Sequence, residues 1–283
     1  MKKIMLAAVL CAVLTLNAAA YFDGGISAVS GPHGYSGTNL NLVIGSGNLA
    51  IQPSLASYTS DALDKTYRTY TLRGAWEAEK YTVAALAGST PEVNDYSNKF
   101  VGGDITFSLT PGSGGHSRLA GPGSRGGARG AQGVTRIDVG AGVKHTIHTR
   151  TILGTDNKTS QTEGSLFAGA KILMVNLSAS YTGYKYGDED AAPLGFVPGH
   201  SFVIGSYPKS SVNVKLDLPG FPMVTPFISY TGVKYKNGVK DSSAYLFGAY
   251  IDLSMITANI GYQVFDYGSN KDNYLSLGAG IKF

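Results

Sequence analysis

The sequence predicts an all-β protein, an up-and-down antiparallel β-barrel of about fourteen strands that spans a membrane. Three observations support this fold class. Apolar and polar residues alternate with a period of two, glycine interrupts almost every such segment, and tight turns alternate with longer polar connections. Because successive side chains of a strand point to opposite faces, each segment has one apolar and one polar face. A helix would need a period of about 3.6 residues instead.

The first residues have the pattern of a secretory signal peptide. Two lysines precede an apolar run from Ile4 to Leu16, and small residues follow up to Ala20. A membrane-spanning helix, the alternative, needs about 20 apolar residues. We therefore expect a signal peptide over 1–20 and a single barrel over 21–283. The only cysteine, Cys11, lies in the signal, so the mature barrel has no thiol chemistry.

The composition excludes several classes of protein. The chain has 38 Gly and 18 Tyr, and only 15% of its residues are charged. Its mean hydropathy of +0.01 is too polar for a helical membrane protein. The net charge of +4 implies no strongly basic surface, so we expect no nucleic-acid partner.

The first half of the mature chain contains seven alternating segments, of which the last is the clearest. In that segment Val139 and Val143 share the apolar face, whereas Asp138 and Gly142 share the opposite one. The first segment is the weakest, so twelve strands are the alternative count. The expected strands are Phe22–Ser30, Thr38–Gly45, Leu49–Tyr58, Tyr67–Trp76, Tyr81–Ser89, Phe100–Thr110 and Val134–Arg150.

The second half continues the pattern with seven further segments. Turn residues separate them, such as the Pro-Gly-Phe-Pro sequence at 219–222. The expected strands are Ser165–Ile172, Val175–Thr182, Val212–Leu218, Thr225–Tyr235, Tyr245–Leu253, Ile256–Val264 and Tyr274–Phe283. An even number of strands returns both chain ends to the same side of a barrel.

The last ten residues carry a family resemblance. Leu275, Leu277, Ala279, Ile281 and Phe283 form an apolar face that ends on an aromatic residue. This ending resembles the C-terminal strand of bacterial outer-membrane β-barrel proteins, a porin-like superfamily. The resemblance implies export through the periplasm and a place in the outer membrane. It also implies contact with lipid and lipopolysaccharide, and recognition of this strand by the barrel-assembly machinery.

The lengths of the connections predict the orientation of such a barrel. Tight turns are expected near Ser46, Glu77, Leu173, Pro219 and Ser254. Longer polar loops are expected at Gly31–Gly37, Thr59–Asp64, Thr90–Asn98, Thr151–Thr162, Gly187–Tyr207, Lys236–Ser242 and Asp266–Asn273. Short periplasmic turns and long extracellular loops are typical of outer-membrane barrels.

One segment, Pro111–Gly133, departs from the pattern. It is rich in glycine and carries Arg118, Arg125 and Arg129, but it has no aromatic residue and little to bury, so we expect a flexible segment. It falls on the side of the short turns. A tolerated insertion or sequence artefact, a plug that enters the lumen, and an error in the assigned topology all remain open.

The sequence shows no catalytic, cofactor or metal site, and we do not expect an enzyme. No Ser/His/acid set has a recognisable spacing. His145 and His148 are three residues apart on a strand, so they face opposite sides and cannot share a metal. The acidic run Asp188–Asp190 is a solvated loop tip or a site for divalent cations.

The two faces of the expected strands give two candidate sets of residues. The candidate pore-lining residues on the polar face are Arg73, Asp104, Arg136, Asp138, Lys144, Arg150, Lys171, Lys215, Asp217, Asp252 and Lys282. The candidate aromatic belt at the membrane boundaries is Trp76, Tyr81, Tyr181, Tyr230, Tyr262 and Phe283. Charges inside a barrel must be either hydrated or paired, and the many inward glycines favour a modest aqueous pore.

Two functions follow from this interpretation. The first is a channel for passive diffusion of small hydrophilic solutes, with a slight anion preference because cations outnumber anions in the pore-lining set. The second is a non-conducting surface barrel whose extracellular loops mediate adhesion or ligand binding. A transporter of hydrophobic substrates ranks third.

Overall fold

The computed structural model describes residues 20–61, 63, 65–78, 80–110, 135–172, 174–197, 200–219, 223–268 and 270–282, with backbone only at 20, 135–136, 194–197 and 200–205. The expected signal peptide, apart from Ala20, and the Pro111–Gly133 segment lie outside these residues. Within the described ranges, no helix has the length and apolar character needed to cross a membrane.

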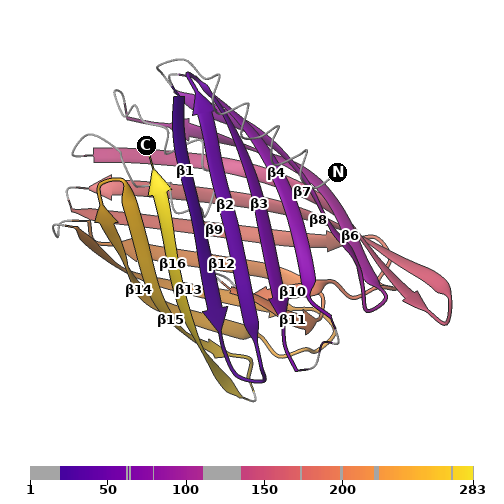
Figure 1. Ribbon diagram of the computed structural model, residues 1–283. Helices are drawn as coiled ribbons and strands as arrows, with labels where there is room; N and C mark the ends of the chain where they lie inside the picture. Colours follow the sequence, from indigo (N-terminus) through magenta and orange to yellow (C-terminus); the bar gives the residue numbers. More distant parts are fainter. Residues whose placement is uncertain are drawn as a thin grey trace, which may run out of the picture.

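The described chain folds into antiparallel strands that close into a barrel (Figure 1). The strands of the first half are β1 (Ala20–Ser30), β2 (Ser36–Ser46), β3 (Leu49–Thr59), β4 (Tyr67–Glu77), β5 (Tyr81–Val93), β6 (Tyr96–Ser108), β7 (Thr135–Ile152) and β8 (Thr155–Ile172). Those of the second half are β9 (Val175–Tyr186), β10 (Leu194–Val197), β11 (His200–Gly205), β12 (Pro208–Asp217), β13 (Val224–Tyr235), β14 (Ser242–Leu253), β15 (Ile256–Asp266) and β16 (Lys271–Lys282).

Fourteen strands form the wall, which confirms the predicted fold and strand count. Each wall strand pairs with its neighbour along the chain, except that β9 pairs with β12, and β1 pairs with β16 to close the circle. All the ladders are antiparallel, so no strand edge remains open along the barrel, as a closed membrane barrel requires. Both β1 and β16 have their chain ends at the same end of the barrel, which we call the terminal end; the other is the loop end.

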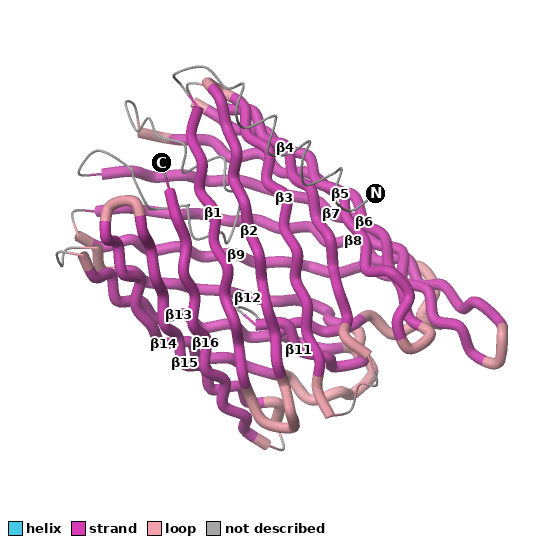
Figure 2. The backbone as a smooth tube through the Cα atoms, in the orientation of Figure 1, coloured by secondary structure: helices cyan, strands magenta, loops and turns pink. Residues whose placement is uncertain are grey.

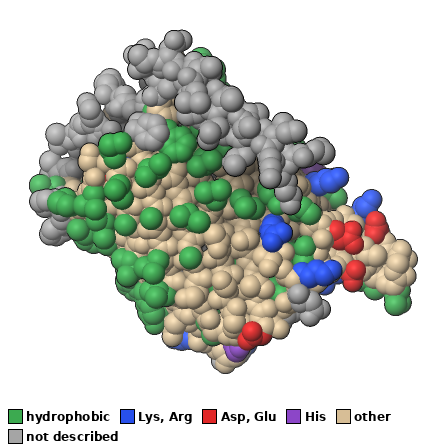
Figure 3. Space-filling view, in the orientation of Figure 1, with side chains coloured by type: hydrophobic (Ala, Val, Ile, Leu, Met, Phe, Trp, Pro, Cys, Tyr) green, Lys and Arg blue, Asp and Glu red, His purple; other side chains and the backbone are tan. Residues whose placement is uncertain are grey.

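The ladder registers give the wall one consistent inner and outer face. For example, Gln52 pairs with Arg73, and Asp104 pairs with Gly142. Alternation along each strand then assigns every second residue to the lumen. The outward face is apolar, as Figure 3 shows for one side, with Val101 59%, Val143 56% and Leu277 54% exposed. An apolar outer band around a polar interior reverses the arrangement of a soluble protein and suits contact with lipid.

Two of the expected long loops are wrong. Residues 90–98 and 151–162 lie mostly in strands, and the turns between these strands contain only Asn94-Asp95 and Leu153-Gly154. Both pairs have positive φ angles, 48° and 59° in the first and 50° and 78° in the second, which suits a tight hairpin turn. The β7–β8 hairpin consequently projects past its neighbours at the loop end (Figures 1 and 2).

The long connection between β9 and β12 contains two short strands. It contains β10 and β11, which pair with each other in a separate two-stranded sheet. β11 contacts β3, which lies far round the wall from the two strands that the connection joins. This connection therefore reaches across the loop end of the barrel instead of pointing away from it.

Candidate functional site

The structure places the predicted residues on two opposite faces. Apart from Arg136, whose side chain lies outside the described part, every candidate pore-lining residue takes an inward register position. Among the candidate belt residues, Trp76, Tyr181, Tyr230 and Tyr262 are exposed on the outer face, by 40%, 51%, 39% and 46%. Tyr81 packs edge-on against Trp76 there, with their ring centroids 5.7 Å apart. Phe283 is not among the described residues.

The inward charges form ion pairs along the wall. The buried pair is Arg73 with Asp104, with Nη2 2.8 Å from Oδ1 and side chains only 9% and 5% exposed. Arg73 also donates from Nη1 to Gln52 Oε1 at 3.1 Å. These contacts satisfy a guanidinium that burial would otherwise penalise.

The other pairs are more open. Lys144 Nζ lies 2.9 Å from Glu163 Oε1, and Lys215 Nζ lies 2.8 Å from Asp217 Oδ1. Lys282 contacts Asp252 near the terminal end. These four pairs neutralise part of the charge on the wall and leave its surface polar.

Several inward acids are not among the candidate pore-lining residues. Glu163 pairs with Lys144 in the ladder, and Asp272 pairs with Phe265. Asp23 and Glu77 also take inward positions, opposite Lys282 and Thr82. The expected excess of cations on the wall is therefore wrong. Glu163 was missed because it follows a stretch that the sequence analysis assigned to a loop.

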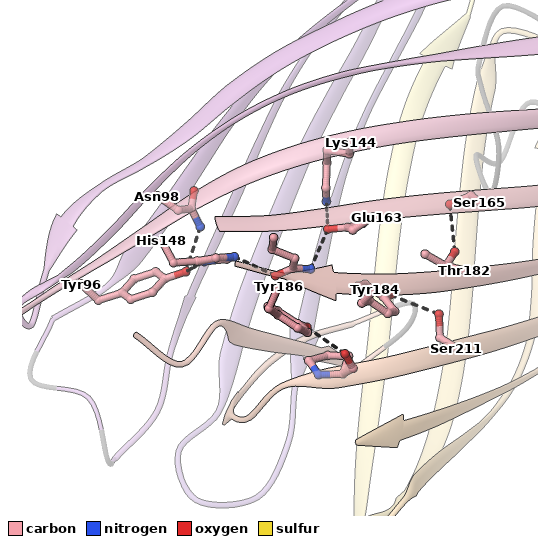
Figure 4. Close-up of polar contacts among 12 residues, drawn as sticks. Tyr96, Asn98, Lys144, His148, Glu163, Ser165, Thr182, Tyr184, Tyr186 and Ser211 are labelled. Carbon is pink, nitrogen blue, oxygen red and sulfur yellow. Dashed lines mark hydrogen bonds and ion pairs between the residues drawn. The ribbon is translucent and has the colours of Figure 1, made fainter. Parts of the chain in front are cut away.

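Five side chains on β6, β7 and β8 form an oriented hydrogen-bond chain (Figure 4). Gln161 Nε2 donates to Glu163 Oε1 at 3.0 Å, so its carbonyl Oε1 faces His148 Nε2 at 2.8 Å and accepts from it. His148 Nδ1 is then an acceptor, and the Tyr96 hydroxyl donates to it at 2.6 Å. Asn98 Nδ2 donates in turn to the Tyr96 oxygen at 3.1 Å.

The two ends of this chain fix its direction. The backbone N–H of Thr90 donates to Asn98 Oδ1 at 3.1 Å, which orients the Asn98 amide. At the other end Glu163 accepts from Gln161 and pairs with Lys144. Every donor therefore points toward the carboxylate, and bonds arranged in this way polarise one another. The chain holds Tyr96, which is fully buried, in one position.

Aromatic residues gather inside the loop end of the barrel. We call this group the tyrosine collar, and it consists of Tyr35, Tyr58, Tyr67, Tyr96, Phe265 and Tyr274, packed with Val29 and Ala244. The rings of Tyr58 and Tyr67 stack with centroids 5.3 Å apart, and those of Tyr35 and Tyr274 meet edge-on at 5.3 Å. The collar narrows the lumen at this end. The hydrogen-bond chain that includes Tyr96 connects the collar to the wall.

Hydrogen bonds hold the β9–β12 connection at the loop end. The backbone N–H of Ala191, which is fully buried, donates to Oγ1 of the inward Thr159 at 2.8 Å. Glu189 accepts from Lys236 Nζ at 2.8 Å and from Asn237 Nδ2 at 3.1 Å. These two hydrogen bonds hold the pKa of the Glu189 carboxyl below its usual range.

Comparison with known proteins supports the fold. No protein-family model matches the chain, and no curated protein matches it. Among solved structures it is similar to CdiB from Acinetobacter baumannii, with 10% identity and a TM-score of 0.53, covering 94% of this chain and 60% of that one. It is equally similar to the CymD monoaromatic hydrocarbon channel, with 10% identity and a TM-score of 0.53 over 96% and 90% of the two chains. The chain has the fold of a bacterial outer-membrane β-barrel. It spans only about 60% of the CdiB chain.

The inner wall of the barrel is polar. Within the described ranges, no group of three or more His, Cys, Asp or Glu residues is arranged to hold a metal ion. Several of the inward charges form ion pairs, and the uncharged inward positions are mainly hydroxyl, amide and glycine residues. Such a wall presents hydrogen-bonding groups to water or to a polar solute.

Proposed function

We propose that the protein is an outer-membrane channel through which small hydrophilic solutes diffuse passively. The observation that carries the proposal is the continuous polar inner face of a closed fourteen-strand wall with an apolar outside. Barrels of about 8 strands are filled by their own side chains, whereas those of 16–18 strands leave an aqueous channel. A fourteen-strand barrel leaves a narrower path, which the tyrosine collar constricts. The likeness in fold to CymD, a channel by its name, adds support.

The proposal also assigns the surroundings of the barrel. The terminal end faces the periplasm, and the loop end faces the outside of the cell. Outer-membrane lipid and lipopolysaccharide contact the apolar outer face. β16 is the strand that the barrel-assembly machinery recognises. The protein works without a cofactor and catalyses no reaction.

The second candidate is a non-conducting surface barrel whose loops mediate adhesion or ligand binding. Two observations favour it: the collar and the β9–β12 connection occupy the loop end, and the β7–β8 hairpin projects outward. Leu153 at the tip of that hairpin is fully exposed, which suits contact with a partner.

Solute flux separates the two candidates. The protein, refolded in detergent and reconstituted into liposomes, should let arabinose and glycine enter, so that the liposomes swell under an osmotic gradient. Swelling should slow as the solute grows, because the collar sets the width. Liposomes that do not swell with any solute, although the barrel is folded by its shift in gel mobility, would favour the surface-binding function.

A further inference from the structure

One buried amide inside the barrel has no hydrogen-bond partner. Gln263 takes an inward position on β15 and is 0% exposed, and neither its Nε2 nor its Oε1 has a partner. Its neighbours across the ladders are Leu246 and Tyr274. An amide buried without partners is costly, so such a group needs a reason.

The other buried inward amides near the loop end are satisfied. Gln161 bonds His148 and Glu163, and Asn98 bonds Tyr96 and Thr90. Among the buried inward amides of the described residues, Asn176 lacks a partner for Oδ1 alone, whereas Gln263 lacks one for both Nε2 and Oε1. Its two N–H groups and its carbonyl oxygen make no hydrogen bond, so they can bond a ligand that displaces the residues covering them.

The surroundings of Gln263 indicate the class of that ligand. Four ion pairs neutralise part of the charge on the wall, and the nearby carboxylate of Asp272 accepts a hydrogen bond from the Tyr274 hydroxyl at 3.5 Å. The adjacent inward residue on β15 is Phe265, part of the collar, and Tyr274 on β16 lies opposite. Hydroxyl groups are also buried on the inward face of nearby strands, namely Ser27, Thr231, Ser242 and Ser276.

We propose that Gln263 and the tyrosine collar form a recognition site for an uncharged polyhydroxylated ring, the chemistry of a sugar. The proposal rests on the proposed function, because it names the solute class of the channel. A sugar hydroxyl both donates and accepts, and it therefore matches an amide that offers both groups at one place. The flat C–H face of a pyranose packs against aromatic rings such as Phe265. The solute replaces the contacts between the collar rings with its own as it passes.

Equilibrium binding tests the site independently of conduction. Isothermal titration of the folded barrel in detergent with maltose should give saturable binding. Gln263→Leu should weaken it by at least about tenfold, equivalent to about 1.4 kcal/mol. Because the amide has no partner to lose, the variant should fold as well as the wild type. Phe265→Leu, which removes a ring but keeps an apolar side chain, should also weaken binding.

The matched control is Asn259→Leu. Asn259 is an inward amide on the same strand, four residues nearer the terminal end and half-buried, so its loss should leave maltose affinity unchanged. Equal maltose affinity in the wild type and in Gln263→Leu would overturn the proposal. So would a wild type that binds acetamide or glutamate but not maltose. A barrel that binds maltose yet passes no solute would instead overturn the proposed channel and leave this site standing.

Discussion

Arg73 on β4 and Asp104 on β6 join across the intervening strand β5 on the inner wall. Arg73 Nη2 lies 2.8 Å from Asp104 Oδ1, and Arg73 Nε donates to Oδ2 at 3.1 Å. The guanidinium therefore binds the carboxylate in a bidentate manner. β5 places Leu86 beside Arg73 and the small Ala84 beside Asp104, over which the pair closes. The pair therefore links β4 and β6 across β5.

Removing one partner of this pair should destabilise the barrel strongly. Asp104→Leu leaves the Arg73 charge buried without its carboxylate, which should lower the free energy of unfolding by about 3–5 kcal/mol. The double variant Arg73→Met/Asp104→Leu should recover most of that loss, because both charges are gone. Denaturant titration in detergent measures both. Arg68→Ala, exposed on the same strand, is the control and should change stability by less than about 0.5 kcal/mol.

The two faces of β7 should respond differently to the same substitution. Val143 is 56% exposed on the outer face, so Val143→Arg should cost roughly 2–4 kcal/mol near the middle of the membrane. Gly142 faces the lumen, where an added Cβ would meet its nearest atoms at an ordinary 3.4 Å. Gly142→Arg should therefore change conductance more than stability. Equal losses of stability at the two positions would contradict the assigned faces.

The ion selectivity of the channel should depend on the balance of inward positive and negative charges. With the inward acids that the sequence analysis missed, the wild type should show little preference between anions and cations. Lys144→Glu together with Lys171→Glu should shift the reversal potential toward cations, since a carboxylate then stands beside Glu163. The shift should fade as salt shortens the Debye length below about 10 Å. Lys158→Glu with Lys185→Glu, both on exposed outward positions, is the control and should leave selectivity unchanged.

Acid should loosen the connection over the loop end. The Glu189 pKa is lowered by Lys236 and Asn237, so their contact stabilises the folded connection above the ordinary glutamate pKa. That stabilisation is lost as pH falls through the lowered pKa. Channel current should become noisier or larger in that acidic window.

The variant Glu189→Gln gives the matching control. It lacks the charge at every pH, so at neutral pH it should behave as the wild type does in acid, without a further change on acidification. A wild type and a variant with the same pH profile would show that Glu189 does not hold the connection.

The membrane-facing part of the fold was predictable from sequence, whereas the loop end was not. Val139 and Val143 alternate with inward residues because lipid selects one face, and this signal gave the strands and their count. In residues 151–162 the outward as well as the inward positions are mostly polar, so the alternation of apolar and polar residues stops although the strands continue. The turn at Leu153-Gly154 was also not predictable. Leu153 takes a φ of 50°, and leucine is not a residue that indicates a turn with positive φ.

The contacts within the lumen depend on the closed register. His148 on β7 is distant in sequence from Gln161 and Glu163 on β8, and it meets them only when β7 pairs with β8. Gln263 is a candidate binding residue only because its buried amide has no hydrogen-bond partner, which the structure reveals and the sequence does not. A sequence pattern assigns a face to each residue, but it does not reveal which inward side chains meet.

Single-barrel current in a planar lipid bilayer tests the central claim most directly. The purified, folded protein should give discrete steps of current in 1 M KCl, and deleting residues 187–207, the connection over the loop end, should enlarge them. The same deletion should leave the barrel folded, because β9 and β12 pair directly. A membrane that holds folded barrels, intact or shortened, and passes no current would contradict the channel.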